Sequence, residues 1–302
     1  LFVFLSAAAG VSAAPEYTAE ADAVSCILMD AKTGRVLFEK NADEALPPAS
    51  VTKVMTMLLV FEALDAGTIK LSDMVQASEH AASMGGSQIY LKVGEEMSVD
   101  DLLKSLIVAS ANDAAVALAE YIAGSEESFV AKMNARAEEL GMKNTHFENT
   151  NGLDDTATNH VTSARDIAIM TRVVGKHEAV FNYSTIWMDT IRDGAIGLTN
   201  TNRLIRFYKG ATGLKTGSTA KAKFCISATA ERDGLSLIAV IMGSPTRDVR
   251  NALAASLFDF GFANYASYTD ESAECETVRV TGGVQNTLKT VHETFSQTVE
   301  KG

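Results

Sequence analysis

The sequence predicts an α/β fold of the mixed α+β type, in which strands from both ends of the chain form one mixed sheet around an inserted helical region. Short apolar, β-branched runs lie near residue 25 and again after residue 213. Between them, apolar side chains recur at helical spacing. The chain has 302 residues, 47% of them hydrophobic, which is enough to bury a large core. Strands that flank a helical middle favour this layered architecture.

The N-terminal elements are a predicted hairpin and a long helix. Residues 23–29 and 35–39 are expected to form strands, joined by a turn at 30–34. A helix is expected over residues 50–66, closed by Gly67. Its apolar residues at helical spacing are Val54, Met57, Leu58, Phe61 and Leu64.

The middle of the chain predicts further helices. Ser98 opens a capping box before a short helix through residues 102–107. Further helices are expected over 114–123, from Ser125 to about 140, and from 163 to about 174. After Gly213, two strands are expected (224–230 and 235–242), followed by a helix over 246–260 that Gly261 ends.

The two ends of the chain differ in texture from the middle. An apolar run followed by Val11-Ser12-Ala13 is typical of a signal peptide, so residues 1–13 are expected to be a partial one, cleaved after Ala13. The protein is therefore expected to be exported. Residues 266–302 are polar and acidic, with strands expected at 277–280 and 287–291. We expect one large domain over 23–265 and then a truncated or vestigial β-module.

Composition excludes several classes of function. A net charge of −12 argues against a nucleic-acid partner, which requires cations to replace phosphate counterions. The three cysteines, Cys26, Cys225 and Cys275, form no metal or redox motif, and Cys26 and Cys225 are expected to be small buried hydrophobes. The five histidines form no zinc-peptidase pair. No metal and no organic cofactor are therefore expected.

Three short motifs carry polar chemistry. Residues 50–53 spell S-x-x-K in the predicted helix, residues 110–112 spell S-x-N on a predicted loop between helices, and residues 215–217 spell K-T-G entering a strand. The same letters at 218–221 and 32–34 fall in predicted turns, where a shared face is not required. Only Ser50 and Lys53 are expected one helical turn apart.

The first motif suits nucleophilic catalysis. A serine hydroxyl is a poor nucleophile until a base removes its proton. Lys53 can be that base only if its pKa falls well below ~10.4, through burial or a second cation such as Lys215. Taken alone, the motif is better explained by Ser50 as a helix N-cap and Lys53 as a solvated residue of a helix face.

The three motifs in this order resemble the penicillin-binding protein and serine β-lactamase superfamily. Within it, the chain is most similar to low-molecular-mass penicillin-binding proteins of the D-alanyl-D-alanine carboxypeptidase type, from about Ser25 to Tyr265. The resemblance implies an antiparallel five-stranded sheet flanked by helices. The similar segments are 48–56, 110–114, 151–154, 162–166 and 213–217.

The resemblance also implies roles for individual residues. Ser50 would form the acyl-enzyme, Lys53 would be its general base, and Ser110 would relay the proton to the leaving amine. The backbone N–H groups of Ser50 and Ser218 would form the oxyanion hole. Arg250 matches a family arginine near the substrate carboxylate, with Arg247 as a rival. The residues implied for substrate binding are Asn112 for the amide, Lys215 and Thr216 for the carboxylate, and Gly217, Ser218 and Arg250. Contacts from Arg192, Asn202 or Arg203 stay open, and His160 reads as loop structure.

The implied function is removal of the terminal D-alanine from peptidoglycan pentapeptide stems by a serine carboxypeptidase that β-lactams acylate. It would act outside the cytoplasm, secreted or bound at the outer face of the cytoplasmic membrane. The family continues to a full β-domain and an amphipathic anchor, so we expect the chain, which stops at Gly302, to be a fragment. Any membrane-surface association would use that anchor.

Other functions of the same fold stay open. A serine β-lactamase shares the acylation chemistry, but the common Glu-x-x-Leu-Asn segment does not occur in this sequence. A DD-endopeptidase would carry identical motifs. A penicillin-sensing module would not need both Lys53 and Ser110.

Overall fold

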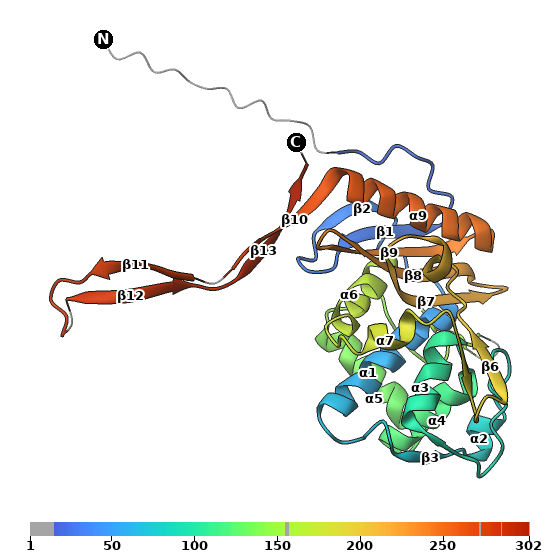
Figure 1. Ribbon diagram of the computed structural model, residues 1–302. Coiled ribbons are helices and arrows are strands. Elements are labelled where there is room, and N and C mark those ends of the chain that lie inside the picture. The colour runs from blue at the N-terminus through green and yellow to red at the C-terminus, as the bar shows by residue number, and fades with distance from the viewer. Residues whose placement is uncertain (1–14, 155–156, 272, 285, 302) are drawn as a thin grey trace.

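The computed structural model describes residues 15–154, 157–271, 273–284 and 286–301. The predicted signal peptide, residues 1–13, lies outside these ranges. The described residues form a body of one sheet and surrounding helices, from which a two-stranded ribbon projects (Figure 1).

The centre of the body is a sheet of five strands: β1 (Ser25–Asp30), β2 (Val36–Lys40), β7 (Ala211–Thr219), β8 (Lys223–Arg232) and β9 (Leu235–Ser244). The order is β2-β1-β9-β8-β7, and every neighbouring pair is antiparallel. The five-stranded antiparallel sheet implied by the family resemblance is therefore confirmed. The mixed sheet expected from the pattern alone differs, because short hairpins join β7, β8 and β9 and leave no parallel crossover.

Helices cover both faces of this sheet (Figure 1). Alternate residues of β1 point to opposite faces, as strand geometry requires. Ile27 and Met29 join the larger core under the helical region, whereas Cys26 and Leu28 join the smaller core under α9 (Arg247–Asn264). The sheet is thus buried on both sides, which explains its nearly continuous apolar strands.

Helix α9 runs past the glycine that was expected to end it. Gly261 lies inside the helix, and a Cβ atom there would approach Leu237 Cδ1 to 2.5 Å and Leu28 Cδ2 to 3.2 Å. The glycine therefore allows the helix to approach the sheet closely, and the predicted end at residue 260 is wrong.

The helical region lies on the other face of the sheet. Helix α1 (Lys53–Asp65), at the centre of this region, is buried on nearly all sides, which explains its largely apolar sequence. The other elements of the helical region are η1 (Ala49–Thr52), α2 (Glu79–Ala82), α3 (Val99–Val108), α4 (Asn112–Ala123), α5 (Glu126–Glu139), α6 (Ala164–Val174), α7 (Val180–Ser184) and α8 (Leu204–Phe207).

Side-chain caps start several of these helices where the sequence predicts. The side chains of Ser98, Ser125 and Ser163 accept the N–H groups of Asp101, Ser128 and Asp166. Such caps satisfy donors that a helix N-terminus otherwise leaves unpaired.

Two small two-stranded sheets and the short helices α2, α7 and α8 were not predicted. The strands of these sheets have three or four residues each, too few for a clear alternation of side chains. They are β3 (Met74–Gln76), β4 (Glu96–Ser98), β5 (Met188–Ile191) and β6 (Ile196–Thr199).

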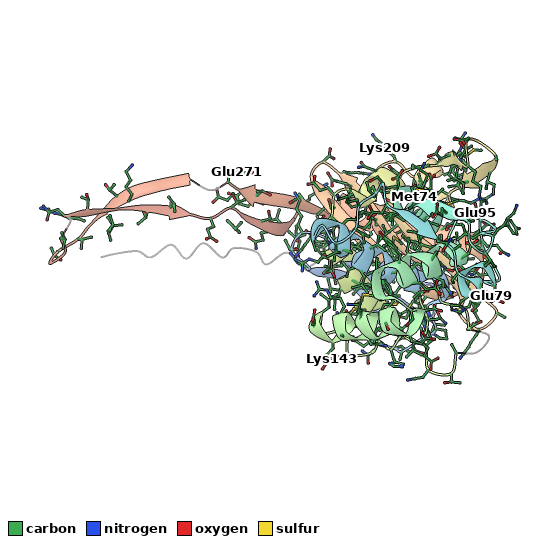
Figure 2. The ribbon with its side chains drawn as sticks, turned by 90° about the horizontal axis from the view of Figure 1, so that it is seen from below. Met74, Glu79, Glu95, Lys143, Lys209 and Glu271 are labelled. Carbon is green, nitrogen blue, oxygen red and sulfur yellow. The ribbon has the colours of Figure 1, made fainter. Side chains whose placement is uncertain are left out.

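The C-terminal ribbon consists of β10 (Tyr265–Asp270) paired with β13 (Phe295–Glu300), and β11 (Ala273–Arg279) paired with β12 (Thr287–His292). It stands clear of the body in both views (Figures 1 and 2). The expected strands at 277–280 and 287–291 overlap β11 and β12. Among the described helices, none has the length and apolarity needed to span a membrane.

A buried hydroxyl ties the base of the ribbon to the first hairpin. Thr298 donates to Asp30 Oδ2 (2.6 Å) and contacts the hydroxyl of Thr33 (2.7 Å). Arg35 donates to the Thr298 carbonyl and pairs with Glu300, both at 2.9 Å. These contacts attach the ribbon to the body at β1 and the turn after it.

Candidate active site

Ser50 and Lys53 meet at the start of the central helix. Lys53 Nζ lies 3.0 Å from Ser50 Oγ. Ser50 belongs to the 3-10 turn η1, and α1 begins only at Lys53, so the single helix predicted from residue 50 is corrected here. A 3-10 turn places residues i and i+3 directly above each other, so it aligns this pair at least as well as an α-helix.

Lys53 is fully buried and bound by two further oxygens. Its Nζ donates to Asn112 Oδ1 (2.5 Å) and to the Asn151 carbonyl (2.8 Å). The Asn112 amide also donates to the Gly85 carbonyl (2.7 Å), which fixes its oxygen toward the lysine. Sequence reasoning missed Asn151, because a main-chain carbonyl leaves no mark in a motif.

The lysine is tuned toward its neutral form. Burial and the nearby Lys215 hold the pKa of Lys53 well below its ordinary value, although Asp113 opposes them. Burial, assisted by Arg250, lowers the pKa of Lys215 to about 7. A buried amine next to a second cation is a plausible general base near neutral pH.

Strand β7 forms one wall of the site. Lys215 is buried and donates to the Thr216 carbonyl (2.7 Å), and Thr216 donates to Thr201 Oγ1 (2.8 Å). A Cβ atom on Gly217 would lie only 2.8 Å from the Ser50 nitrogen. Ser218 was expected in a turn, but it is an exposed residue of the strand. The strand therefore runs directly against the turn that carries Ser50.

The S-x-N motif forms the opposite wall. Ser110 lies in the bend between α3 and α4 with a φ of 63°, which is uncommon for a residue other than glycine. Asn112, expected on a loop, is the first residue of α4. The sharp bend lets Ser110 line the cleft while Asn112 reaches Lys53.

These walls enclose a cleft of about 470 Å³. The cleft is lined by Ser50, Ser110, Thr216, Gly217, Ser218, Arg250 and Arg247, together with Ser87, Trp187, Thr199, Asn200, Thr201 and Arg203. Lys53, Asn112 and Lys215 lie behind this lining. Apart from Arg203, the second group was missed, because all of it except Thr199 lies in loops, which carry no periodic pattern.

The two arginines at one end of the cleft differ in burial. Arg250 is 2% exposed and donates to the Cys225 carbonyl (3.2 Å) and Asn251 Oδ1 (2.9 and 3.1 Å). Burial lowers the pKa of Arg250 to about 10. Arg247 is exposed. The buried arginine is thus held in place by its hydrogen bonds, whereas its rival Arg247 is exposed to solvent.

The remaining open candidates are accounted for. Arg192 pairs with Glu95 (2.6 Å), and Asn202 is buried against the Gly213 carbonyl (2.7 Å). His160 accepts the Glu148 N–H at Nδ1 (2.9 Å), so its Nε2 carries the proton that faces Thr52 Oγ1 (2.7 Å). Burial lowers the pKa of His160 to about 4, which keeps it neutral in this structural role.

The described parts of the chain hold no group of three potential metal ligands among His, Cys, Asp and Glu. Cys26 and Cys225 are free and buried, as expected for small hydrophobes. The side chain of Cys275 lies outside what the structure describes.

Comparisons with known proteins give one consistent result. The family model of D-alanyl-D-alanine carboxypeptidases matches residues 10–246. The D-alanyl-D-alanine carboxypeptidase DacF of Bacillus subtilis (strain 168) is 47% identical over 287 residues, which are 93% of this chain and 73% of that protein. The family match includes Ser50, Lys53 and Lys215, and it ends before Arg250.

Solved structures agree. Penicillin binding protein 5 from Haemophilus influenzae has a TM-score of 0.86 and 34% identity, covering 95% of this chain and 85% of its own. Penicillin-Binding Protein D2 from Listeria monocytogenes, solved in an ampicillin-bound form, has a TM-score of 0.73 and 30% identity, covering 80% and 98%. The likeness therefore extends over the body that contains the cleft.

Proposed function

This chain belongs to the D-alanyl-D-alanine carboxypeptidase family, and we propose that it removes the terminal D-alanine of peptidoglycan pentapeptide stems through an acyl-enzyme on Ser50. Its class is that of the penicillin-binding serine peptidases. The observation that carries the assignment of the nucleophile is the contact of 3.0 Å between Ser50 Oγ and the buried amine of Lys53.

Acylation starts with a proton transfer. Neutral Lys53 accepts the hydroxyl proton of Ser50, and the oxygen attacks the carbonyl carbon of the penultimate D-alanine. The carbonyl oxygen becomes an oxyanion, which the N–H groups of Ser50 and Ser218 stabilise. The closeness of Gly217 to the Ser50 nitrogen supports this pairing, because it brings β7 against η1.

Release and hydrolysis return the enzyme to its first state. The C–N bond breaks, and the leaving nitrogen takes the proton from Lys53 through Ser110, giving free D-alanine. Water then attacks the ester, with Lys53 again accepting a proton, and Ser50 recovers its hydroxyl. Besides the substrate and this water, the steps use only groups of the chain.

Binding of the substrate carboxylate is assigned to the cationic end of the cleft. Lys215, Thr216 and Arg250 supply charge and hydrogen-bond donors there, and Asn112 is assigned to the substrate amide. A carboxylate next to Lys215 would favour the charged form of this lysine. Binding would thus restore the charge that burial disfavours.

β-Lactams are proposed to enter the same cleft and acylate Ser50, which the ampicillin-bound relative supports. Fast hydrolysis of penicillin is not expected, because no carboxylate lines the cleft among the described residues to activate a second water. The protein acts outside the cytoplasm, as its cell-wall relatives do. We further propose that residues 23–265 form the peptidase domain and that a β-module begins at residue 266. Attachment to the outer face of the cytoplasmic membrane would use an anchor that follows this module.

Replacement of Ser50 tests the proposal. The variant Ser50→Ala should release no D-alanine from a peptide ending in D-alanyl-D-alanine and should not be labelled by penicillin. Ser87→Ala, which alters another hydroxyl of the same cleft, should keep both reactions. D-alanine release by purified Ser50→Ala would overturn the assignment, and rapid turnover of penicillin by the unaltered protein would favour a β-lactamase.

A further inference from the structure

A carboxylate on α5 reaches the loop that contacts the catalytic lysine. Glu126, the first residue of α5, accepts both the N–H (3.0 Å) and the hydroxyl (2.7 Å) of Thr150 through Oε1. Its other oxygen lies 2.7 Å from His80 Nε2. Glu126 is largely buried, with 13% of its side chain exposed. The glutamate therefore holds one residue of the loop at two points.

The opposite side of this loop faces α1. Thr56 donates its hydroxyl proton to the Thr150 carbonyl (2.6 Å), and Lys53 donates to the next carbonyl, that of Asn151 (2.8 Å). Gly152 then lies so close to Ala49 that a Cβ atom would meet its carbonyl oxygen at 1.8 Å. The loop is thus clamped between Glu126 and the helix that carries the base.

The Asn151 carbonyl decides how a neutral lysine is oriented. A neutral amine has two N–H bonds and one lone pair. Fixed acceptors at Asn112 Oδ1 and the Asn151 carbonyl use both N–H bonds. The lone pair is then left for the third neighbour, the Ser50 hydroxyl. Loss of either acceptor would let the amine rotate and donate to Ser50, in which geometry it cannot accept a proton.

We propose that Glu126 is a positioning residue for acylation: by holding Thr150, it keeps the Asn151 carbonyl against Lys53 and directs the lysine lone pair at Ser50. This inference rests on the proposed function, in which Lys53 is the base. It assigns Glu126 no contact with the substrate.

The test separates the acylation rate constant from the preceding binding constant, using a fluorescent penicillin in stopped-flow experiments. Glu126→Ala should lower the rate constant about 10- to 100-fold, because small misplacements of a catalytic group have effects of this size. The dissociation constant of the initial complex should stay within about threefold, since the cleft lining is unaltered. Glu126→Gln, whose amide oxygen can accept both Thr150 bonds, should restore the rate to within about threefold. Thr150→Val, which removes only the hydroxyl contact, should lower the rate constant by a smaller factor.

Asn134→Ala is the matched control. Asn134 also lies on α5 and also holds main chain before the loop, through two bonds of 2.8 Å to Phe147. Asn134→Ala should lose about as much thermal stability as Glu126→Ala, but it should be acylated at the rate of the unaltered protein. Equal acylation by Glu126→Ala and Asn134→Ala, or an equal loss in Glu126→Gln, would overturn the inference. Absence of acylation in the unaltered protein would instead refute the proposed function.

Discussion

Two lysines at the site, Lys53 and Lys215, are fully buried. Burial and the charge of Lys215 hold the pKa of Lys53 well below its ordinary value, and burial and the charge of Arg250 lower the pKa of Lys215 to about 7. This arrangement favours the neutral amine that the proposed base requires, but burying these groups also opposes folding. A catalytic gain at this site is therefore expected to carry a stability cost.

The variant Lys215→Met should be less active than the unaltered protein but more stable, and the gain in stability should depend on pH. The pKa of Lys215 is 10.5 when unperturbed and about 7 in the folded chain, so between these values the unfolded chain holds a proton that the folded chain lacks. The free energy of unfolding therefore rises with pH between these two values. Below pH 7 the folded chain bears the full cost of burying the charged lysine. Urea unfolding should show the variant more stable than the unaltered protein at pH 6, with the gain vanishing above pH 10.5.

The same variant should release D-alanine much more slowly, because the substrate carboxylate loses one of its two proposed cations and Lys53 loses the charge that lowers its pKa. Lys132→Met, on the exposed side of α5, is the control and should change neither property. A stability gain of equal size at pH 6 and pH 11 would show that Lys215 is not the titrating group.

At the scale of elements, the site depends on how closely β7 approaches η1. A methyl group at Gly217 would lie 2.8 to 2.9 Å from three main-chain atoms, those of Ser50, Pro48 and Val51. Main chain cannot move aside as a flexible side chain can, so Gly217→Ala must displace the turn that carries the nucleophile. Overpacking of this kind costs about 1–3 kcal/mol.

Penicillin labelling of Gly217→Ala should be about 100-fold slower, with the fold retained by circular dichroism. Gly197→Ala is the matched control, because this strand glycine has no atom within 4 Å of its would-be Cβ. Normal labelling of Gly217→Ala would mean that the turn can move without harm.

The sequence predicts most long elements because their signals are local. Serine caps at residues 98, 125 and 163 mark helix starts by chemistry that acts within a few residues. Gly261 misled for the opposite reason: its role is a close approach to Leu237 and Leu28, on two strands of the sheet outside the helix. A glycine that ends a helix and a glycine that allows close packing look the same in the sequence. Only the packed structure distinguishes them.

The candidate site divides in the same way. The three motifs name side chains whose chemistry is unusual in combination, and the structure brings Ser50, Lys53 and Lys215 to one cleft. The Asn151 carbonyl and the support from Glu126 had no such signal. The first is a main-chain group, which every residue carries, and the second is a carboxylate whose partner, Thr150, lies in another segment of the chain, so spacing alone could not identify them.

On the scale of the whole molecule, the ribbon depends on one small contact surface with the body. Thr298 is 2% exposed, and its hydroxyl bonds the buried Asp30. Thr298→Val should cost about 1–3 kcal/mol locally, because it leaves a buried carboxylate oxygen unpaired. Hydrogen exchange at residues 295–300 should accelerate, while penicillin labelling stays normal. Gln297→Val, at an exposed position of the same strand, should leave exchange unchanged; equal acceleration in both would refute the anchor.

The position of β7 at the end of the strand order has a further consequence for recognition. One side of this strand pairs with β8, and within the described residues no strand of the sheet lies on the other side. An extended peptide in the cleft can therefore add to the sheet as a temporary sixth strand, bound through main-chain hydrogen bonds. Recognition of this kind depends on the direction and the extended conformation of the bound peptide more than on its side chains. An enzyme built this way tolerates variation along the stem while its pocket selects only the terminal residues.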